Sequence, residues 1–120
     1  MPRPLAFALD LVVVVAFVAI GRSAHDEANA VIGLATTAAP FVVALILGWI
    51  GVLVLHRDPV MLAEGIGIWL GTWIIGLVLR AAVFAGGTAP AFVVVAGVSL
   101  AVGLIGWRAV RAILTRRSKK

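Results

Sequence analysis

The stretch VIGLATTAAPFVVALILGWIGVLVL, which runs from Val31 to Leu55, is an apolar segment without a charged side chain. It exceeds the about 20 residues that a helix needs to cross the hydrocarbon core of a bilayer. Three further apolar runs accompany it, at Leu5 to Ile20, Val60 to Phe84 and Pro90 to Trp107. Only short polar hinges separate the four runs, so we predict an all-α, membrane-spanning four-helix bundle.

The composition agrees with this prediction. Of the 120 residues, 63% are hydrophobic and 12% are charged, whereas an ordinary soluble domain is about half apolar and about a quarter charged. A chain this short cannot bury so many apolar side chains by itself, so lipid must surround them. The sequence has no cysteine, which excludes disulfides, thiol catalysis and thiolate metal sites.

We expect helices over residues 5–21, 33–55, 62–84 and 91–107, which together form a four-span domain over residues 1–109. The start of the second helix is ambiguous, because Pro40 suits either a first turn or a kink. A start at Pro40 gives only about 24 Å of helix for a core of about 30 Å, so we favour a start near Gly33. The fourth helix either ends at Trp107 or continues as a basic amphipathic stretch.

The beginning of the chain resembles a secretory signal peptide, because Arg3 precedes an apolar stretch and Ala28-Asn29-Ala30 has the form of a cleavage site. Asp10 interrupts that stretch, and the polar segment before Ala28 is long for a cleavage region. We therefore expect a retained helix.

The charge distribution predicts the orientation. The net charge of +5 comes mainly from the end of the chain, with Arg108, Arg111, Arg116, Arg117, Lys119 and Lys120. The positive-inside rule then places both termini in the cytoplasm, with residues 110–120 as a basic tail beside anionic lipid headgroups of the inner cell membrane. This topology accounts for the charge, so we expect no nucleic-acid partner.

Asp10 is the most informative single residue, because a carboxylate inside an apolar helix is costly unless it is paired or protonated. One interpretation is a structural ion pair with Arg108, with Arg3 or Arg111 as substitutes. A second is that the side chain reaches out to the inner headgroups. A third is a transport site in which Asp10 binds and releases a proton or a cation.

The other candidate polar residues are Arg80, Arg22 and His25. Arg80 lies near the outer end of the third helix, where Asp26 or Glu27 is the expected partner. Arg22 and His25 belong to the first outer loop, whose single histidine is a weak metal signal, so we expect no metal. The sequence also shows no catalytic triad spacing, phosphate loop or H-E-x-x-H motif, so we expect no cofactor and no enzymatic activity.

Two further patterns concern packing. The four tryptophans form a candidate aromatic cluster: Trp49, Trp69, Trp73 and Trp107. Their side chains either pack within the bundle or form an aromatic wall that holds a cation. Trp69 and Trp73 are four residues apart and share a helical face. Small residues at spacings such as Gly67-x-x-x-Gly71 allow close helix contact, either within the bundle or in a homodimer.

Taken in order, several short motifs span the chain: Asp10, Gly21-Arg22-x-x-His25, Pro40-Phe41, Gly48-Trp49, Gly67-x-Trp69, Leu79-Arg80, Phe92-Val93-Val94-Val95-Ala96 and Gly106-Trp107-Arg108. From about Leu5 to Ala109 the chain thereby resembles a family of bacterial membrane proteins, domain-of-unknown-function family 3054. The resemblance implies a small multi-span inner-membrane protein without an assigned activity. The resemblance also supports treating five polar residues within these motifs as candidate functional residues: Asp10, Arg22, His25, Arg80 and Arg108.

Two function hypotheses follow. In the first, the protein is a structural or accessory membrane component in which Asp10 and Arg108 lock the bundle. In the second, it is a dimeric proton- or cation-coupled transporter of small molecules that uses Asp10. Small multidrug resistance transporters also have four spans and one acidic residue in the first helix, a likeness of layout only.

Overall fold

The computed structural model describes residues 1–24, 30–83 and 88–118. Within these ranges the chain forms four helices and no strand: α1 (Arg3–Ala24), α2 (Ala30–Val54), α3 (Leu62–Ala82) and α4 (Pro90–Ser118). Each helix is long and apolar enough to span a membrane. The predicted all-α fold with four membrane-capable helices is confirmed.

Two helix boundaries resolve alternatives that the sequence left open. α2 begins at Ala30 and contains Pro40 within it, so the early start is correct. α4 does not end at Trp107 but continues to Ser118, which makes most of the expected tail helical. The reason is local, because residues 107–118 contain no glycine or proline and half of them are Ala or Arg, which favour helix.

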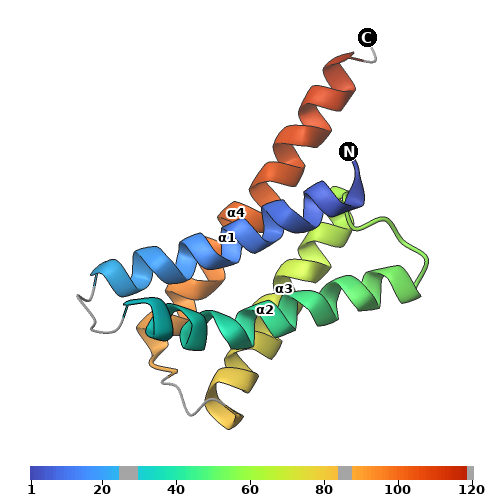
Figure 1. Cartoon of the computed structure of the whole chain (residues 1–120). Coiled ribbons are helices and arrows are strands. Elements are labelled where there is room, and N and C mark those ends of the chain that lie inside the picture. Colours follow the sequence, from blue (N-terminus) through green and yellow to red (C-terminus); the bar gives the residue numbers. More distant parts are fainter. Residues whose placement is uncertain (25–29, 84–87, 119–120) are drawn as a thin grey trace.

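The helices form a bundle in which α2 packs on α3, α3 on α4, and α1 on α2 and α4. In Figure 1, α1 crosses α4, and among the described residues α1 and α3 are not in contact. Arg3 Nε lies 3.9 Å from a carboxylate oxygen of Asp58 in the α2–α3 connection. The start of α1, residues 55–61 and the adjoining part of α4 therefore lie at the same end of the bundle, which we call the turn end. Phe17, Phe41 and Phe92 meet away from it, with ring centroids 5.8 to 6.3 Å apart.

The α2–α3 connection has a defined geometry. The backbone N–H of His56 donates to Leu53 O and that of Arg57 to Val52 O, and His56 has a φ of 57°. This is the Schellman arrangement that ends many helices, with His56 at the position where glycine is usual. Asp58 Oδ1 then accepts the backbone N–H of Val60 at 3.1 Å. The connection is therefore fixed, and it holds the carbonyl of Pro59 against the bundle.

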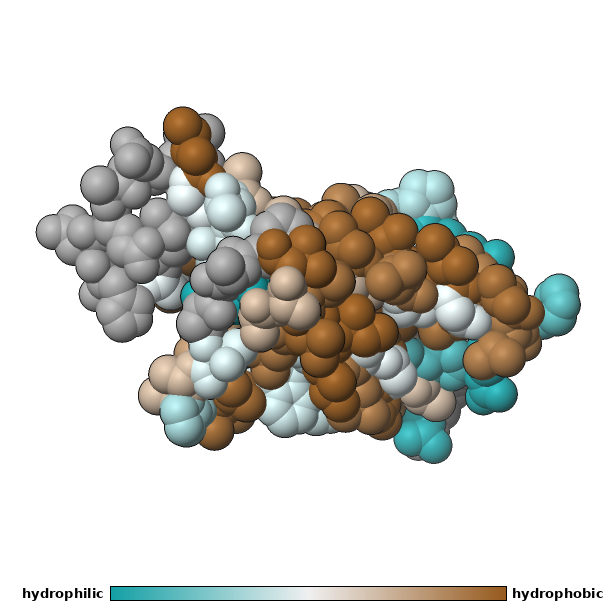
Figure 2. Space-filling view, turned by 90° about the horizontal axis from the view of Figure 1, so that it is seen from below, coloured by the Kyte–Doolittle hydropathy of each residue, from teal (hydrophilic) through white to brown (hydrophobic). Residues whose placement is uncertain are grey.

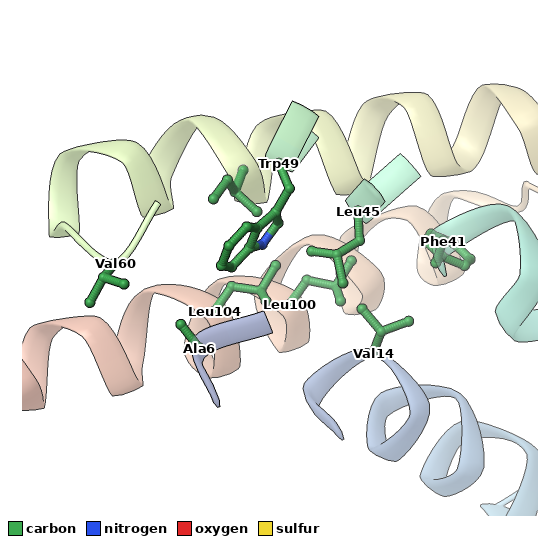
Figure 3. Packing of buried hydrophobic residues seen from close by; sticks show 9 residues of the cluster. Ala6, Val14, Phe41, Leu45, Trp49, Val60, Leu100 and Leu104 are labelled. Carbon is green, nitrogen blue, oxygen red and sulfur yellow. The ribbon is translucent and has the colours of Figure 1, made fainter. Parts of the chain in front are cut away.

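The core is narrow and apolar. Figure 3 shows side chains from all four helices and from the turn packed together, among them Ala6, Val14, Phe41, Leu45, Trp49, Val60, Leu100 and Leu104. Glycines let the helices approach: a Cβ at Gly97 would lie 2.6 Å from the Trp73 ring, and one at Gly76 would lie 2.5 Å from the Phe41 ring. Gly76 and Gly97 therefore serve packing within the bundle, whereas Gly67 of the predicted Gly67-x-x-x-Gly71 pattern has open space around it. Homodimerisation stays a prediction.

The outer surface of the bundle is also apolar. Ile20 and Val102 are each 71% exposed, and many other large aliphatic side chains are exposed along every helix. Figure 2 shows apolar residues across the middle of one face, with hydrophilic residues gathered toward one side of the view. A continuous surface of this kind is unfavourable in water and suits a lipid environment, where helices satisfy their own backbone groups.

Candidate functional site

Asp10 lies about two turns into α1 and is completely buried. Its carboxylate accepts four hydrogen bonds. Trp107 Nε1 and Arg108 Nη1 donate to Oδ1, each at 2.9 Å. Trp49 Nε1 donates to Oδ2 at 2.8 Å, and Arg108 Nη2 donates to the same oxygen at 2.7 Å. An ionised carboxylate offers about four acceptor sites, so these donors from α2 and α4 saturate it.

Arg108 is the centre of the site, and its side chain is also fully buried. Besides both oxygens of Asp10, it binds two backbone carbonyls: Nε donates to Pro59 O at 3.0 Å, and Nη1 donates to Leu104 O at 2.8 Å. One guanidinium therefore joins α1, α4 and the α2–α3 turn. Of the three interpretations of Asp10, the structure shows the ion pair with Arg108, and it has the two-pronged geometry that makes arginine–carboxylate pairs strong.

Two tryptophans complete the site. The Trp49 ring packs edge-on against Phe7, with centroids 5.3 Å apart, and the Trp107 ring lies 4.4 Å from the guanidinium carbon of Arg108. From the sequence these residues were expected either to pack within the bundle or to form a wall that holds a cation, and neither expectation included their donation to Asp10. The chemistry of their side chains could have indicated this role, because an indole N–H inside an apolar segment needs a hydrogen-bond acceptor.

Gly65, in the first turn of α3, makes room for Arg108. A Cβ at this position would overlap Cδ of the arginine and come 3.0 Å from its Nε. A side chain here would displace Arg108 from the carbonyl of Pro59. The small-residue spacing pointed instead to Gly67, which begins the Gly67-x-x-x-Gly71 pattern but has open space around it.

The remaining two tryptophans belong to a separate contact. Trp69 and Trp73 share a helical face, as their spacing predicted, and their rings stack with centroids 5.5 Å apart. Their indole nitrogens donate to backbone carbonyls of α4, Trp69 to Gly97 at 2.8 Å and Trp73 to Val93 at 3.0 Å. The predicted cluster of four is thus two pairs with different partners, and this pair joins α3 to α4.

The other candidates lie away from Asp10. The guanidinium carbon of Arg80 lies 4.5 Å from the centre of the Phe92 ring, near the other end of the bundle. Its expected partners Asp26 and Glu27, and His25, lie outside the described residues. Arg22 belongs to α1, but its side chain is outside the described part. Within the described ranges, no group of three His, Cys, Asp or Glu residues is placed to bind a metal.

A second largely buried acid, Glu64, lies in the first turn of α3 beside the turn end, and no sequence pattern marked it as a candidate. Its Oε1 is 3.5 Å from Arg57 Nε, and its side chain is only 10% exposed. Its other oxygen is buried without a hydrogen-bond partner in the structure. Like Asp10, Glu64 is largely shielded from solvent, but unlike Asp10 its carboxylate lacks a full set of hydrogen bonds. It is therefore a useful control for experiments on Asp10.

Fold and site together define a class: a helical protein with four membrane-capable helices and a buried, fully hydrogen-bonded ion pair at one end. Residues 7–111 match the family described as a protein of unknown function (DUF3054). The chain belongs to this family, as the order of its short motifs indicated. No curated protein and no solved structure matches the chain significantly.

Proposed function

We propose that this protein is a multi-pass component of the bacterial inner membrane, with a structural or accessory role and no catalytic activity of its own. In this proposal Asp10 and Arg108 lock the bundle. The observation that carries it is the saturation of the Asp10 carboxylate by Trp49, Trp107 and Arg108, with both charged side chains removed from solvent.

The competing transporter hypothesis fits this geometry less well. A carrier carboxylate must bind and release a proton or a cation, and this requires a free acceptor site during the cycle. Both oxygens of Asp10 already accept two hydrogen bonds each. Transport would require a second arrangement in which Arg108 leaves Asp10 and also gives up its bonds to Pro59 and Leu104.

The proposed topology places the turn end in the cytoplasm. Arg3, Arg57 and the cations of the α4 extension belong to this end, and Arg80 lies near the other. This asymmetry follows the positive-inside rule. Because the chain has no native cysteine, single cysteines at position 2 and position 118 can be tested for labelling from either side of the membrane, and accessibility from the periplasm would contradict the proposal.

Asp10→Asn separates the two functions, with Glu64→Gln as the matched carboxylate-to-amide control. For a structural lock, the Asp10 variant denatures at a lower temperature in detergent, while the Glu64 variant changes little. In that case, vesicles with wild-type protein show no proton flux above that of empty vesicles when candidate substrates are added. A substrate-driven flux in the wild type that is lost in a normally stable Asp10→Asn variant would replace the structural proposal with the transporter.

A further inference from the structure

We propose that the C-terminal extension of α4, residues 110–118, is a binding site for anionic lipid headgroups. In this site, which we call the arginine collar, Arg111, Arg116 and Arg117 contact lipid phosphates around the circumference of the helix. The proposal is independent of the role of Asp10 and requires only that α4 crosses the bilayer.

The first argument is length. α4 has 29 residues, which corresponds to about 43 Å of helix for a hydrocarbon core of about 30 Å. If Pro90 marks one boundary of that core, the other boundary falls near Val110. Figure 1 shows the end of α4 extending beyond the other three helices. Arg111 therefore lies in the headgroup layer, which is about 5–8 Å deep on each side. Arg116 and Arg117 lie six and seven residues beyond Val110, about 9–10 Å along the helix, so their long side chains reach back to the phosphates.

The second argument is the direction of the side chains. At about 100° per residue, Arg111, Arg116 and Arg117 point in three different directions around the helix. Residues between and before them are apolar and unpacked: Val110, Ile113 and Leu114 are 56% to 59% exposed. Val110 lies at the boundary, and Ile113 and Leu114 lie just beyond it among the arginines. This is the arrangement expected for a helix leaving the lipid, with aliphatic side chains toward the hydrocarbon and guanidinium groups at the phosphates.

The third argument is charge. Other arginines at the turn end have acidic neighbours: Arg3 lies beside Asp58, Arg57 beside Glu64, and Arg108 binds Asp10. In the part of the chain that the structure describes, no acidic side chain pairs with the three arginines of the collar. Their counter-ions must come from outside the chain. At this depth, the anions within reach are lipid phosphates, which favours lipid over a nucleic acid or an acidic protein.

The test uses the full chain with a single cysteine, Ile113→Cys, because there is no native cysteine. A fluorophore on this cysteine is read in nanodiscs that contain a small, equal fraction of nitroxide-headgroup phosphatidylglycerol or nitroxide-headgroup phosphatidylcholine. Identical leaflets make the result independent of orientation. We expect phosphatidylglycerol to be enriched about fivefold or more beside the label, from the attraction of even one surface cation.

Two charge variants decide the outcome. Replacing all three arginines by glutamine (R111Q, R116Q and R117Q) lowers the enrichment severalfold, to what Lys119 and Lys120 alone produce, whereas replacing them by lysine, which keeps the charge, preserves most of it. Equal quenching by the two lipids, or an enrichment that is the same in the glutamine and lysine variants, overturns the proposal. A response to an added RNA oligonucleotide in phosphatidylcholine nanodiscs, without lipid enrichment, would also overturn it and assign the collar to nucleic acid.

Discussion

Arg108 binds both carboxylate oxygens of Asp10, at 2.9 and 2.7 Å, across 98 positions of sequence. The pair joins the first helix to the last, and the bond from Arg108 to Pro59 adds the turn between the second and third. Because α1 touches only α2 and α4 within the described chain, the donors to Asp10 are the main polar contacts that hold α1 in place. Four predictions follow from this arrangement and its surroundings.

The first prediction concerns the coupling between the two charges. Removing one partner of a buried ion pair leaves an uncompensated charge, at a cost of about 3–5 kcal/mol. We therefore expect Asp10→Asn and Arg108→Gln each to lower the free energy of unfolding by this order. The double variant should lose clearly less than the sum of the two. SDS titration in mixed micelles measures the free energy of unfolding of the wild type, the two single variants and the double variant, which together form a double-mutant cycle. If the losses of the single variants add up in the double variant, the two charges do not depend on each other.

The second prediction ranks the tryptophans. Trp49→Phe and Trp107→Phe each remove a hydrogen bond to a carboxylate, which contributes about 1.5–3 kcal/mol. Trp69→Phe removes a bond to the neutral carbonyl of Gly97, for which about 0.5–1.5 kcal/mol is expected. The same unfolding titration tests the order. A loss for Trp69→Phe as large as those for the other two would mean that aromatic packing, and not the acceptor, sets the contribution.

The third prediction compares two glycines of α3. Gly65→Ala places a methyl group on the side chain of Arg108, and overpacking of this kind costs about 1–3 kcal/mol. Gly67→Ala is the control, because open space surrounds that position and alanine favours helix by about 1 kcal/mol over glycine. Stability should fall in the first variant and stay equal or rise in the second. Equal effects would show that Arg108 moves aside without loss.

The fourth prediction concerns Thr72, which is completely buried in α3 with a hydroxyl that has no hydrogen-bond partner in the structure. Valine has nearly the same shape and removes an unsatisfied polar group, which by itself costs about 1–3 kcal/mol. We expect Thr72→Val to unfold at the same or a higher SDS fraction than the wild type. A clear loss of stability would reveal that the hydroxyl has a partner, such as a bound water molecule.

Much of the architecture was predictable because it is local. Apolar length places each span independently, which is why the runs around Val31–Leu55 and Val60–Phe84 became α2 and α3. The Asp10–Arg108 pair was among three interpretations of Asp10, because the order of the spans places Arg108 within reach of it and few charges lie in the membrane-capable segments. The shared face of Trp69 and Trp73 required only their spacing along one helix.

The rest depended on how the helices rotate and approach one another. Sequence alone left Trp49 and Trp107 as packing residues or as part of a cation-holding wall, because depth does not reveal which side of a helix faces the carboxylate. Its small-residue spacing favoured Gly67, yet of these two glycines of α3 it is Gly65 that meets Arg108. Hydropathy determined the number of the spans, since each segment partitions into lipid on its own. The partners of Asp10 were decided by tertiary packing, because a hydrogen bond needs two groups from different helices within about 3 Å.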